Sequence, residues 1–331
     1  MLIPPNYILT PPISQSLQTI EANRQLIDAI QIPPEVETNI RRQSTLKSSL
    51  FSARIEGNPL TLDELGEKSS SDLKKKEVFN ILKALQFVHE RGFRDITINV
   101  ITQLHTKTMN DLINKSNFGT FRKEVSAIFN TSGLAIYMPP PPSQINYLME
   151  RLVKFIHSDK EQFIPIKAAL IHYTFEKIHP FLDGNGRVGR LLFQLILQKG
   201  GYGMKQLVSI EEYLDNHRSH YYGALEARER DVTEYIEFML QALANTSDKT
   251  KQLILMKEKF QIQDYLLPRR AEIYNVIKDH RIVNFDMIKR RFMAINERTL
   301  RYDLKKLTDA KLIKKLGTTK GVYYEAINSQ F

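Results

Sequence analysis

Residues 178–190 read IHPFLDGNGRVGR and lie between two apolar runs, residues 166–177 and 188–196. Both runs have the character of largely buried helices, and Pro165 suits the first turn of the earlier one. Pro180 prevents that helix from continuing, because proline lacks the N–H that the next turn needs. The stretch therefore gathers an imidazole, a carboxylate, an amide flanked by glycines and two guanidiniums between two core helices, which indicates a functional site.

Two familiar loops are excluded by their context. Gly184–Gly189 matches the dinucleotide pattern G-x-G-x-x-G, but that pattern follows a strand of a βαβ unit, and here a helix precedes it. Asp183-Gly184-Asn185 imitates the start of a calcium loop, yet the sixth position is Val188 and the twelfth is Gln194, where Gly and Glu are needed. We expect neither a dinucleotide nor calcium at this loop.

An anion site remains as the third interpretation. Glycines on both sides of Asn185 allow consecutive N–H groups to point at one phosphate, and the following helix directs its positive end there. Arg187 and Arg190 are three residues apart, so they share a helix face and could clamp two further phosphoryl groups. Asp183 could hold the Mg²⁺ that accompanies a di- or triphosphate. His179, with an ordinary pKa near ~6.5, would be the base.

Composition limits the class of protein. The chain has 331 residues, which suggests two or three domains, and 42% hydrophobic with 25% charged residues is usual for a folded globular protein. It has no cysteine, which excludes disulfides, thiolate metal sites and cysteine nucleophiles. The N-terminal residues lack a basic segment followed by an apolar one, and no apolar run reaches the ~20 residues of a membrane span. We expect a cytoplasmic protein without a membrane contact.

The net charge of +10 is concentrated at the C-terminal end. Residues 268–331 contain 15 Lys and Arg against 7 Asp and Glu, a local net charge of +8. A basic module of this kind favours a polyanionic partner, although a solvated surface that only aids solubility has the same composition.

A carboxylate stands at an unfavourable place in the N-terminal region. Pro33-Pro34 ends an N-terminal arm, and a helix is expected over residues 35–56, stopped by Gly57-Asn58-Pro59. Glu56 then lies in the last turn, where the helix dipole disfavours a negative charge, and Ser52 lies on the same face. From the residues alone, Glu56 would be an ordinary surface carboxylate unless a cation lies nearby.

The rest of the first two-thirds is predicted to be helical, with one hairpin. His105 falls on an apolar helix face and is interpreted as a core histidine rather than a ligand. Two β-rich pieces, residues 125–129 and 134–138, are joined by a turn at residues 130–133, and a polar linker is expected at residues 245–251. The predicted helices span residues 72–91, 98–113, 143–156, 210–218 and 231–243, with Ser143 capping the third and a capping box at Ser209 opening the fourth.

Residues 179–190 resemble the signature of the Fic family, His-Pro-Phe-x-(Asp/Glu)-Gly-Asn-Gly-Arg-x-x-Arg, at every specified position. The resemblance covers about residues 40–243, and its hairpin is similar to the family flap that docks a target segment. Fic proteins mostly transfer AMP from ATP to a Ser, Thr or Tyr hydroxyl of another protein. The resemblance implies the following roles: His179 as base, Asp183 as Mg²⁺ ligand, Gly184, Asn185 and Gly186 as the α-phosphate cradle, Arg187, Gly189 and Arg190 with the β- and γ-phosphates, and Tyr221 and Tyr222 near the adenine.

Residues 52–57, Ser-Ala-Arg-Ile-Glu-Gly, resemble the inhibitory pattern (Ser/Thr)-x-x-x-Glu-(Gly/Asn) of the same family. The resemblance implies that Glu56, with Ser52, pairs with Arg190, which then cannot hold the γ-phosphate. ATP would bind in an unproductive pose. In some family members this glutamate also helps to remove AMP by activating water.

The tail is similar to winged-helix DNA-binding modules. Three short helices at residues 269–279, 285–292 and 297–308 precede two strands, residues 312–316 and 321–326, joined by residues 317–320. In this arrangement the third helix would be the recognition helix, with Arg298, Arg301 and Lys305 turned outward toward DNA. Winged helices also serve as protein-docking or dimer modules.

These observations predict a mainly α protein: a Fic helical bundle with a small β-hairpin flap, and a C-terminal winged-helix domain of the α+β type. The expected divisions are an N-terminal helical region at residues 1–95 with an inhibitory helix at about 35–57, a Fic catalytic core at 96–244, a linker or helix at 245–267, and the winged helix at 268–331.

The function implied by the resemblance is self-inhibited protein adenylyl transfer, with ATP as substrate, Mg²⁺ as cofactor and an unknown protein as target. Self-modification and a homodimer are also expected. Three alternatives stay open: a DNA-binding regulator that uses the Fic core as a nucleotide sensor, removal of AMP through Glu56, and transfer of another phosphate-linked group. The intact pair Arg187 and Arg190 favours ATP as the donor.

Overall fold

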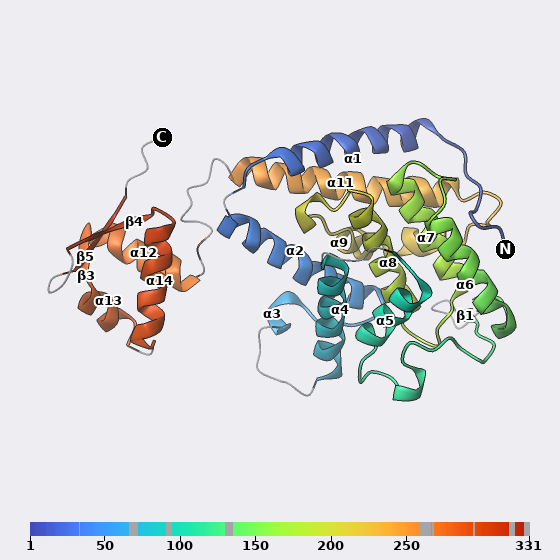
Figure 1. The fold of residues 1–331 in the computed structure, drawn as a ribbon, viewed down its shortest axis with the longest axis horizontal. Coiled ribbons are helices and arrows are strands. Elements are labelled where there is room, and N and C mark those ends of the chain that lie inside the picture. The colour runs from blue at the N-terminus through green and yellow to red at the C-terminus, as the bar shows by residue number, and fades with distance from the viewer. Residues whose placement is uncertain are drawn as a thin grey trace. The chain divides into compact units, whose positions relative to one another are not determined.

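Helices dominate the computed structural model of the chain, which confirms the mainly α fold class (Figure 1). The structure describes residues 1–32, 34–65, 72–90, 95–129, 135–257, 266, 268–293, 295–317 and 322–327. Contacts divide the chain into two compact units. The large unit contains residues 1–31 and 40–252, and the C-terminal unit contains residues 32–39 and 253–331.

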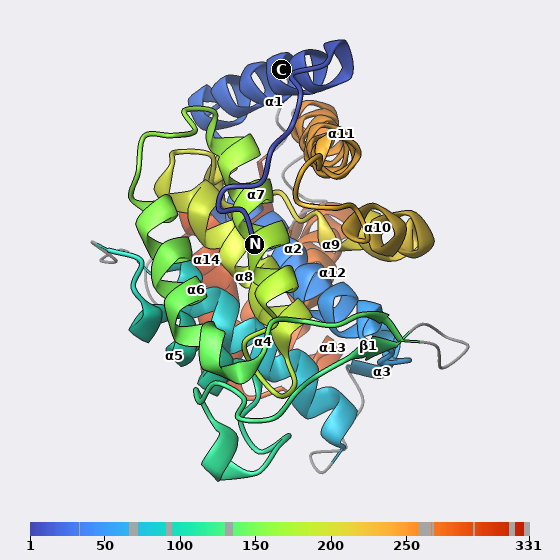
Figure 2. The same cartoon turned by 90° about the vertical axis from the view of Figure 1, so that its right-hand side faces the viewer.

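Two helices that flank the opening stretch form the centre of the large unit. Helix α7 (Ile164–Ile178) is buried continuously from Pro165 to Phe175, and α8 (Asn185–Lys199) packs against it. Burial on all sides explains why the apolar run of α7 has no polar face. Three further helices surround the pair: α6 (Pro142–Ile156) packs on α7, while α4 (Leu73–His89) and α5 (Ile98–Thr108) pack on α8 (Figure 2).

The N-terminal arm contains a helix that was not predicted. Helix α1 (Pro11–Ala29) begins at Thr10, whose hydroxyl accepts a hydrogen bond from the N–H of Ile13. It lies beside α11 (Thr233–Lys257) (Figure 1). The Asn23 side chain on α1 donates to the Ser247 hydroxyl on α11 at 3.0 Å. Helix α2 (Pro34–Ile55) follows and ends before Gly57, which has φ 96°.

The linker predicted at residues 245–251 is wrong, because α11 continues through it to Lys257. Two polar residues in this part of α11 are buried rather than solvated: Ser247 is fully buried and Thr250 nearly so. Their hydroxyls donate to carbonyls of the preceding turn, which satisfies them inside a helix. Residues 258–265 and 267, the rest of the predicted linker or helix, lie outside the described residues.

Several predicted helix limits need correction. Helix α5 stops at Thr108 rather than Ile113, and Ser143 does not cap α6, which begins at Pro142 without a side-chain cap. The capping box at Ser209 is not formed, because the Ser209 hydroxyl donates to the Glu211 carboxylate instead. The segment expected as one helix over residues 210–218 is divided into α9 (Glu211–Asn216) and α10 (Arg218–Leu225).

The hairpin of the large unit is short. Strands β1 (Ile128–Phe129) and β2 (Ala135–Tyr137) pair in antiparallel fashion, and the turn predicted at residues 130–133 lies outside the described residues, as does Leu134. The remaining short elements of this unit are α3 (Leu62–Leu65), η1 (Lys115–Asn117) and η2 (Met204–Gln206).

The C-terminal unit has the three predicted helices, α12 (Pro268–His280), α13 (Phe285–Arg291) and α14 (Glu297–Asp309). The predicted strands are present as β4 (Ile313–Leu316) and β5 (Tyr323–Ala326), while residues 318–321 between them lie outside the described part. An unpredicted strand, β3 (Ile282–Asn284), completes an antiparallel sheet of order β3-β5-β4. Buried Asp303 ties α14 to α12 through ion pairs with Arg269 and Arg270.

No helix among the described residues is long and apolar enough to cross a membrane.

Candidate active site

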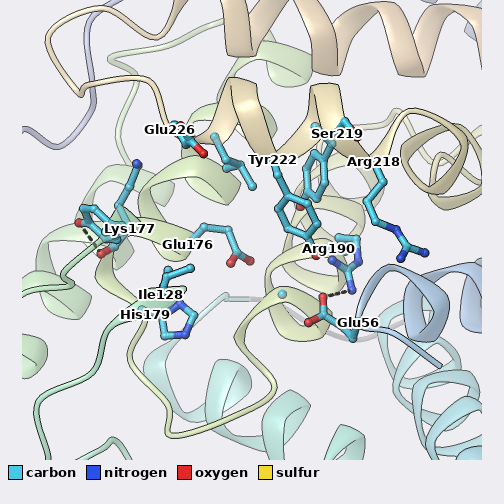
Figure 3. Close-up of a pocket in the computed structure, with 14 residues that line it drawn as sticks. Glu56, Ile128, Glu176, Lys177, His179, Arg190, Arg218, Ser219, Tyr222 and Glu226 are labelled. Carbon is cyan, nitrogen blue, oxygen red and sulfur yellow. Dashed lines mark hydrogen bonds and ion pairs between the residues drawn. The ribbon is translucent and has the colours of Figure 1, made fainter. Parts of the chain in front are cut away.

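A cavity of about 530 Å³ lies where α7, α8 and α10 meet the end of α2 (Figure 3). Acidic and basic side chains line much of it: Glu56, Glu176, Lys177, His179, Arg190, Arg218 and Glu226. The hairpin contributes Ile128 and Tyr137, so strands far from α2 in sequence close the same space. The cavity therefore joins the opening stretch, the predicted inhibitory helix and the predicted flap.

His179 ends α7 in an unusual backbone conformation. Its φ of 49° and ψ of 59° lie in the left-handed region, which costs free energy for a residue with a side chain. Arg122 stabilises this turn: its Nε donates to the His179 carbonyl at 2.8 Å and its Nη2 to the Pro140 carbonyl at 2.6 Å. The backbone N–H of Arg122 also donates to the Pro180 carbonyl at 2.9 Å. One buried guanidinium thus connects the base of the flap to the backbone of His179.

The protonation state of His179 fits a base. Burial lowers the pKa of its imidazole to about 4, opposed by the Glu176 backbone carbonyl as an acceptor and by the Glu56 and Asp183 charges. The ring is therefore neutral at pH 7 and can accept a proton. The negative charge of a bound triphosphate would raise this pKa toward neutrality.

The loop between α7 and α8 is shaped by its own side chains. Asn185, which is 2% exposed, accepts from the Phe181 N–H and donates to the Phe181 carbonyl, both at 2.9 Å. Its amide therefore fixes the loop, and a ligand could use only the backbone of this residue. His105 supports the loop from behind: Nδ1 accepts from the Gly119 N–H, so Nε2 donates to the Asp183 carbonyl, each at 3.0 Å. The interpretation of His105 as a core histidine is confirmed.

The glycines of the signature serve different contacts. Gly184 has φ 84°, in the region that favours glycine, where it precedes α8. A Cβ on Gly186 would collide with Glu56 Oε1, so this glycine makes room for the Glu56 carboxylate. A Cβ on Gly189 would collide with Glu176 Oε1. Gly189, assigned to the nucleotide from sequence, therefore faces α7 and allows a carboxyl group to approach α8.

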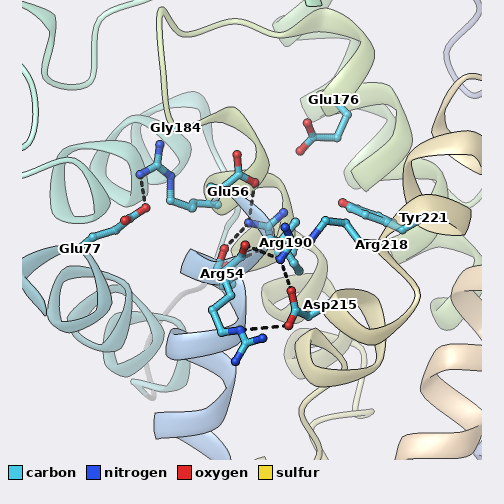
Figure 4. Close-up of polar contacts among 12 residues, drawn as sticks. Arg54, Glu56, Glu77, Glu176, Gly184, Arg190, Asp215, Arg218 and Tyr221 are labelled. Atoms are coloured by element: carbon cyan, nitrogen blue, oxygen red, sulfur yellow. Dashed lines mark hydrogen bonds and ion pairs between the residues drawn. The ribbon is translucent and has the colours of Figure 1, made fainter. Parts of the chain in front are cut away.

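Glu56 and Ser52 lie against Arg190, as the resemblance implied (Figure 4). Glu56 Oε1 is 2.8 Å from Arg190 Nη2, which also donates to the Ser52 carbonyl at 2.8 Å. Arg190 Nε donates to the Ser52 hydroxyl at 3.0 Å. Although burial acts to raise the pKa of Glu56, the Arg190 and Arg187 guanidiniums hold it below its ordinary value. The carboxylate is therefore ionised at neutral pH, and it is the cation Arg190 that makes its position acceptable.

The end of α2 is held by side chains from α10. Arg218 Nη2 donates to the Arg54 carbonyl at 2.6 Å, and the Tyr222 hydroxyl donates to the Ile55 carbonyl at 3.1 Å. Asp215 pairs with both Arg54 and Arg218 (Figure 4). These contacts satisfy carbonyls that a helix end leaves without partners, and they fix the turn that carries Glu56.

Arg187 does not line the cavity, in contrast to Arg190. Its Nη1 is 2.5 Å from Glu77 Oε1 on α4, and its Nη2 is 2.7 Å from Asp183 Oδ1. Its Nε is buried and has no hydrogen-bond partner among the described residues. The two signature arginines therefore leave α8 toward different partners, although their spacing predicted that they would act as one clamp.

Asp183 is the one residue predicted as a metal ligand, and its side chain is 55% exposed. Within the described residues, no three or more His, Asp or Glu side chains are grouped to hold a metal ion. Mg²⁺ usually binds through one or two protein carboxylates together with phosphate oxygens and water. An exposed single carboxylate beside the loop fits this pattern.

Glu176 is a site residue that was not predicted. Its carboxyl group lies in the cavity between His179 and Tyr222 (Figure 3), and its Oε1 has no hydrogen-bond partner among the described residues. Burial raises its pKa to about 8, assisted by Glu56 and opposed by Arg190. The group is therefore mainly protonated at pH 7, and it can donate a hydrogen bond without adding a negative charge.

The tyrosine pair occupies one wall of the cavity. Tyr221 is buried, and its hydroxyl is 3.2 Å from His172 Nε2, while Tyr222 holds the end of α2.

The residues predicted to contact DNA belong to the C-terminal unit. Arg298, Arg301 and Lys305 are all exposed on α14. The Arg301 guanidinium lies 3.9 Å from the centre of the Phe285 ring and 3.7 Å from Glu297.

Four contributors were missed because the sequence carries little signal for them. Glu77 lies among lysines on α4 and resembles a solvated surface residue, and Arg122 and Arg218 belong to no motif. Glu176 lies one helical turn before His179 on the same α7, and that spacing was the only available signal.

Comparisons with known proteins place part of the chain in a family. Residues 95–197 match the Fic/DOC family. Over 252 residues, or 72% of the chain, the sequence is 28% identical to the protein adenylyltransferase Fic of Drosophila yakuba and to that of Drosophila melanogaster. The chain spans about half the length, 48%, of these relatives.

Two solved structures share the fold. A Fic family protein from Desulfovibrio desulfuricans G20 has a TM-score of 0.68 at 21% identity, over 98% of both chains. Residues 134–508 of Fic-1 from C. elegans have a TM-score of 0.59 at 20% identity, over 75% of this chain and 73% of that one.

Proposed function

This chain carries a Fic/DOC family domain at residues 95–197, and we propose that it is a protein adenylyltransferase inhibited by its own Glu56. The observation that carries the proposal is that His179, Gly186 in the first turn of α8, and Arg190 line one cavity, with Glu56 on Arg190. The donor would be ATP, because a cradle at a helix N-terminus and a buried arginine suit a chain of phosphates.

The reaction would be a phosphoryl-type transfer at the α-phosphorus of ATP. A hydroxyl of the target loses its proton to the neutral His179 imidazole, and its oxygen forms a bond to the α-phosphorus. The bond from that phosphorus to the bridging oxygen breaks, and pyrophosphate leaves with the electron pair. N–H groups at Asn185 and Gly186, at the positive end of α8, would stabilise charge on the α-phosphate.

Asp183 would hold Mg²⁺, which would supply positive charge that offsets the charge of the phosphates. Arg190 would contribute a second positive charge once it is released from Glu56. In the present arrangement the Glu56 carboxylate competes with a phosphate oxygen for the same Nη2, which explains inhibition without blocking the rest of the cavity.

The test is labelling of protein by ATP that carries a labelled α-phosphate. We expect stronger labelling of protein in a lysate with Glu56→Gly than with the unmodified chain, and none with Glu56→Gly/His179→Ala. Intact mass would identify the added group as AMP or another phosphate-linked group, and would also detect self-modification. Equal labelling with and without Glu56→Gly would reject the inhibition. Release of AMP from labelled protein by the unmodified chain, but not by Glu56→Gly, would instead assign AMP removal to Glu56.

A second function, DNA binding, is favoured by the exposed cations of α14. The C-terminal unit has the element order of a winged helix, in which α14 would be the recognition helix. Triple substitution of Arg298, Arg301 and Lys305 by glutamine should weaken a DNA gel shift and reduce its salt dependence. A shift that survives this substitution unchanged would exclude α14 as the contact, and a shift modulated by ATP without covalent labelling would favour a nucleotide sensor.

A further inference from the structure

Arg187 is enclosed by carboxylates at both terminal nitrogens. Its side chain is 9% exposed, and its two partners are Glu77 at 2.5 Å and Asp183 at 2.7 Å. The remaining nitrogen, Nε, is buried. A phosphate in the cavity could reach this guanidinium only by displacing one of the carboxylates.

Glu77 is fixed more firmly than Glu56. It lies inside α4, its side chain is 15% exposed, and its Oε2 accepts from Asn58 Nδ2 at 2.9 Å while Oε1 holds Arg187. Asn58 itself is buried, and it also donates to the Lys74 carbonyl on the same helix. Displacing Glu77 would break a buried ion pair and a buried hydrogen bond together, and both are costly to leave unsatisfied.

Asp183 is the partner of Arg187 that has access to solvent. Its side chain is 55% exposed, against 15% for Glu77, so Arg187 connects a buried carboxylate to an exposed one. Outer-shell groups that hydrogen-bond a ligating carboxylate orient it and tune its affinity for a metal. Glu77 holds Arg187, and Arg187 in turn holds Asp183, so Arg187 has the position of such an outer-shell group.

We propose, resting on the function proposed above, that Arg187 is a positioning residue for the metal ligand Asp183 rather than a phosphate contact, and that Glu77 fixes Arg187 in this role. Arg190 is then the arginine of the pair that binds phosphate. Substitution of Arg187 should therefore change the affinity for Mg²⁺, and substitution of Arg190 should change the affinity for the nucleotide.

The experiment measures ATP binding by calorimetry to the full chain carrying Glu56→Gly and His179→Ala, which removes inhibition and prevents turnover. In EDTA, we expect Arg190→Gln to weaken binding by about tenfold or more, as for loss of a charged hydrogen bond. Arg187→Gln should change binding in EDTA by less than about threefold, because Arg187 touches no phosphate in our proposal.

A Mg²⁺ titration at fixed ATP gives the second readout. Arg187→Gln and Glu77→Gln should each raise the half-saturating Mg²⁺ concentration, by roughly 10-fold or more for Arg187→Gln, while Arg190→Gln should leave it unchanged. If Arg187→Gln fails to fold, Glu77→Gln/Arg187→Gln removes both buried charges and takes its place. The proposal is overturned if Arg187→Gln weakens binding in EDTA as much as Arg190→Gln does, or if the Mg²⁺ requirement is unchanged.

These measurements need no protein target. Absence of protein labelling would reject adenylyl transfer while the comparison of the two arginines remained measurable.

Discussion

Arg187 and Arg190 lie one turn apart on α8, and each pairs with a carboxylate from another helix. Arg190 is held by Glu56, which follows the end of α2, has a side chain 27% exposed, and lies at the cavity. Arg187 is held by Glu77, inside α4 and away from the cavity. We therefore expect the Arg190 pair to be exchangeable and the Arg187 pair to be permanent, although both arginines belong to the same motif.

The difference lies in what holds each carboxylate. Within the described part of the chain, Glu56 has one hydrogen bond, to Arg190, whereas Glu77 has Arg187 and Asn58 as partners. A carboxylate with one partner at a helix end can leave when a phosphate competes, while a buried carboxylate with two partners cannot leave without a large loss of free energy. The contact that we propose to be inhibitory is thus the one whose carboxylate has fewer partners.

We expect the largest effect from breaking the pair of Glu77 and Arg187, which should lower the stability of the protein. Glu77→Gln keeps an acceptor for Asn58 but leaves the buried Arg187 with Asp183 alone, which should lower the free energy of unfolding by about 3 kcal/mol. The melting temperature should fall by roughly 6–12 °C, since each kcal/mol shifts it by about 2–4 °C in a unit of this size.

Glu56→Gln serves as the matched control for that change. It should cost about 1 kcal/mol, because the Glu56 side chain is partly exposed and Arg190 keeps both contacts to Ser52. Calorimetric unfolding of the two variants measures the difference, and equal losses would contradict the distinction between the two pairs.

The second prediction concerns activity and tests the pair of Glu56 and Arg190. Glu56→Gly should raise the labelling rate by roughly 10- to 100-fold, because a charge-assisted hydrogen bond is worth about 1.5–3 kcal/mol and each 1.36 kcal/mol is tenfold. Glu77→Gln should not raise it. Initial rates of protein labelling under one ATP concentration compare the two, and activation by Glu77→Gln would mean that Arg187 is also withheld from phosphate.

The third prediction concerns how stability depends on pH through Glu176. This residue lies near Arg190 but belongs to neither pair. Its pKa of about 8 exceeds the ordinary value of 4.5, so the folded chain retains a proton that the unfolded chain loses between these values. Its contribution to stability is therefore greatest below pH 4.5 and is lost as the pH rises to about 8.

Glu176→Gln removes this titration. The variant should gain roughly 2–4 °C in melting temperature relative to the unmodified chain at pH 8.5, and little at pH 4.5. Melting curves at the two pH values measure it, and a gain that is the same at both would show that Glu176 is not protonated in the folded chain.

The smallest effect is expected from Ser52→Ala. Arg190 loses the Ser52 hydroxyl but keeps the Ser52 carbonyl and Glu56, so labelling should increase by only about two- to fivefold. Ser49→Ala, on the same helix but bonded within it, is a matched control that should leave the rate unchanged. An increase as large as that of Glu56→Gly would make the hydroxyl, rather than the carboxylate, the main restraint on Arg190.

Local patterns in the sequence were sufficient to predict several helices and the loop between α7 and α8. The apolar runs beside Pro165 and Pro180 predicted α7 and α8, because complete burial leaves no polar face to confuse the pattern. The prediction of a linker at residues 245–251 was wrong because it relied on polar composition. Ser247 and Thr250 are buried with their hydroxyls hydrogen-bonded, and composition cannot distinguish such residues from solvated ones.

The sequence by itself determined that His179, Asp183, Arg187 and Arg190 lie near one another, because one loop and the helix turn after it carry all four whatever the rest of the chain does. Tertiary structure decided which arginine faces the cavity and which carboxylate each arginine contacts. Glu77 reaches Arg187 across 110 residues and Glu56 reaches Arg190 across 134. Such pairs follow from how helices pack, and local sequence patterns contain no information about the partner that a neighbouring helix will supply.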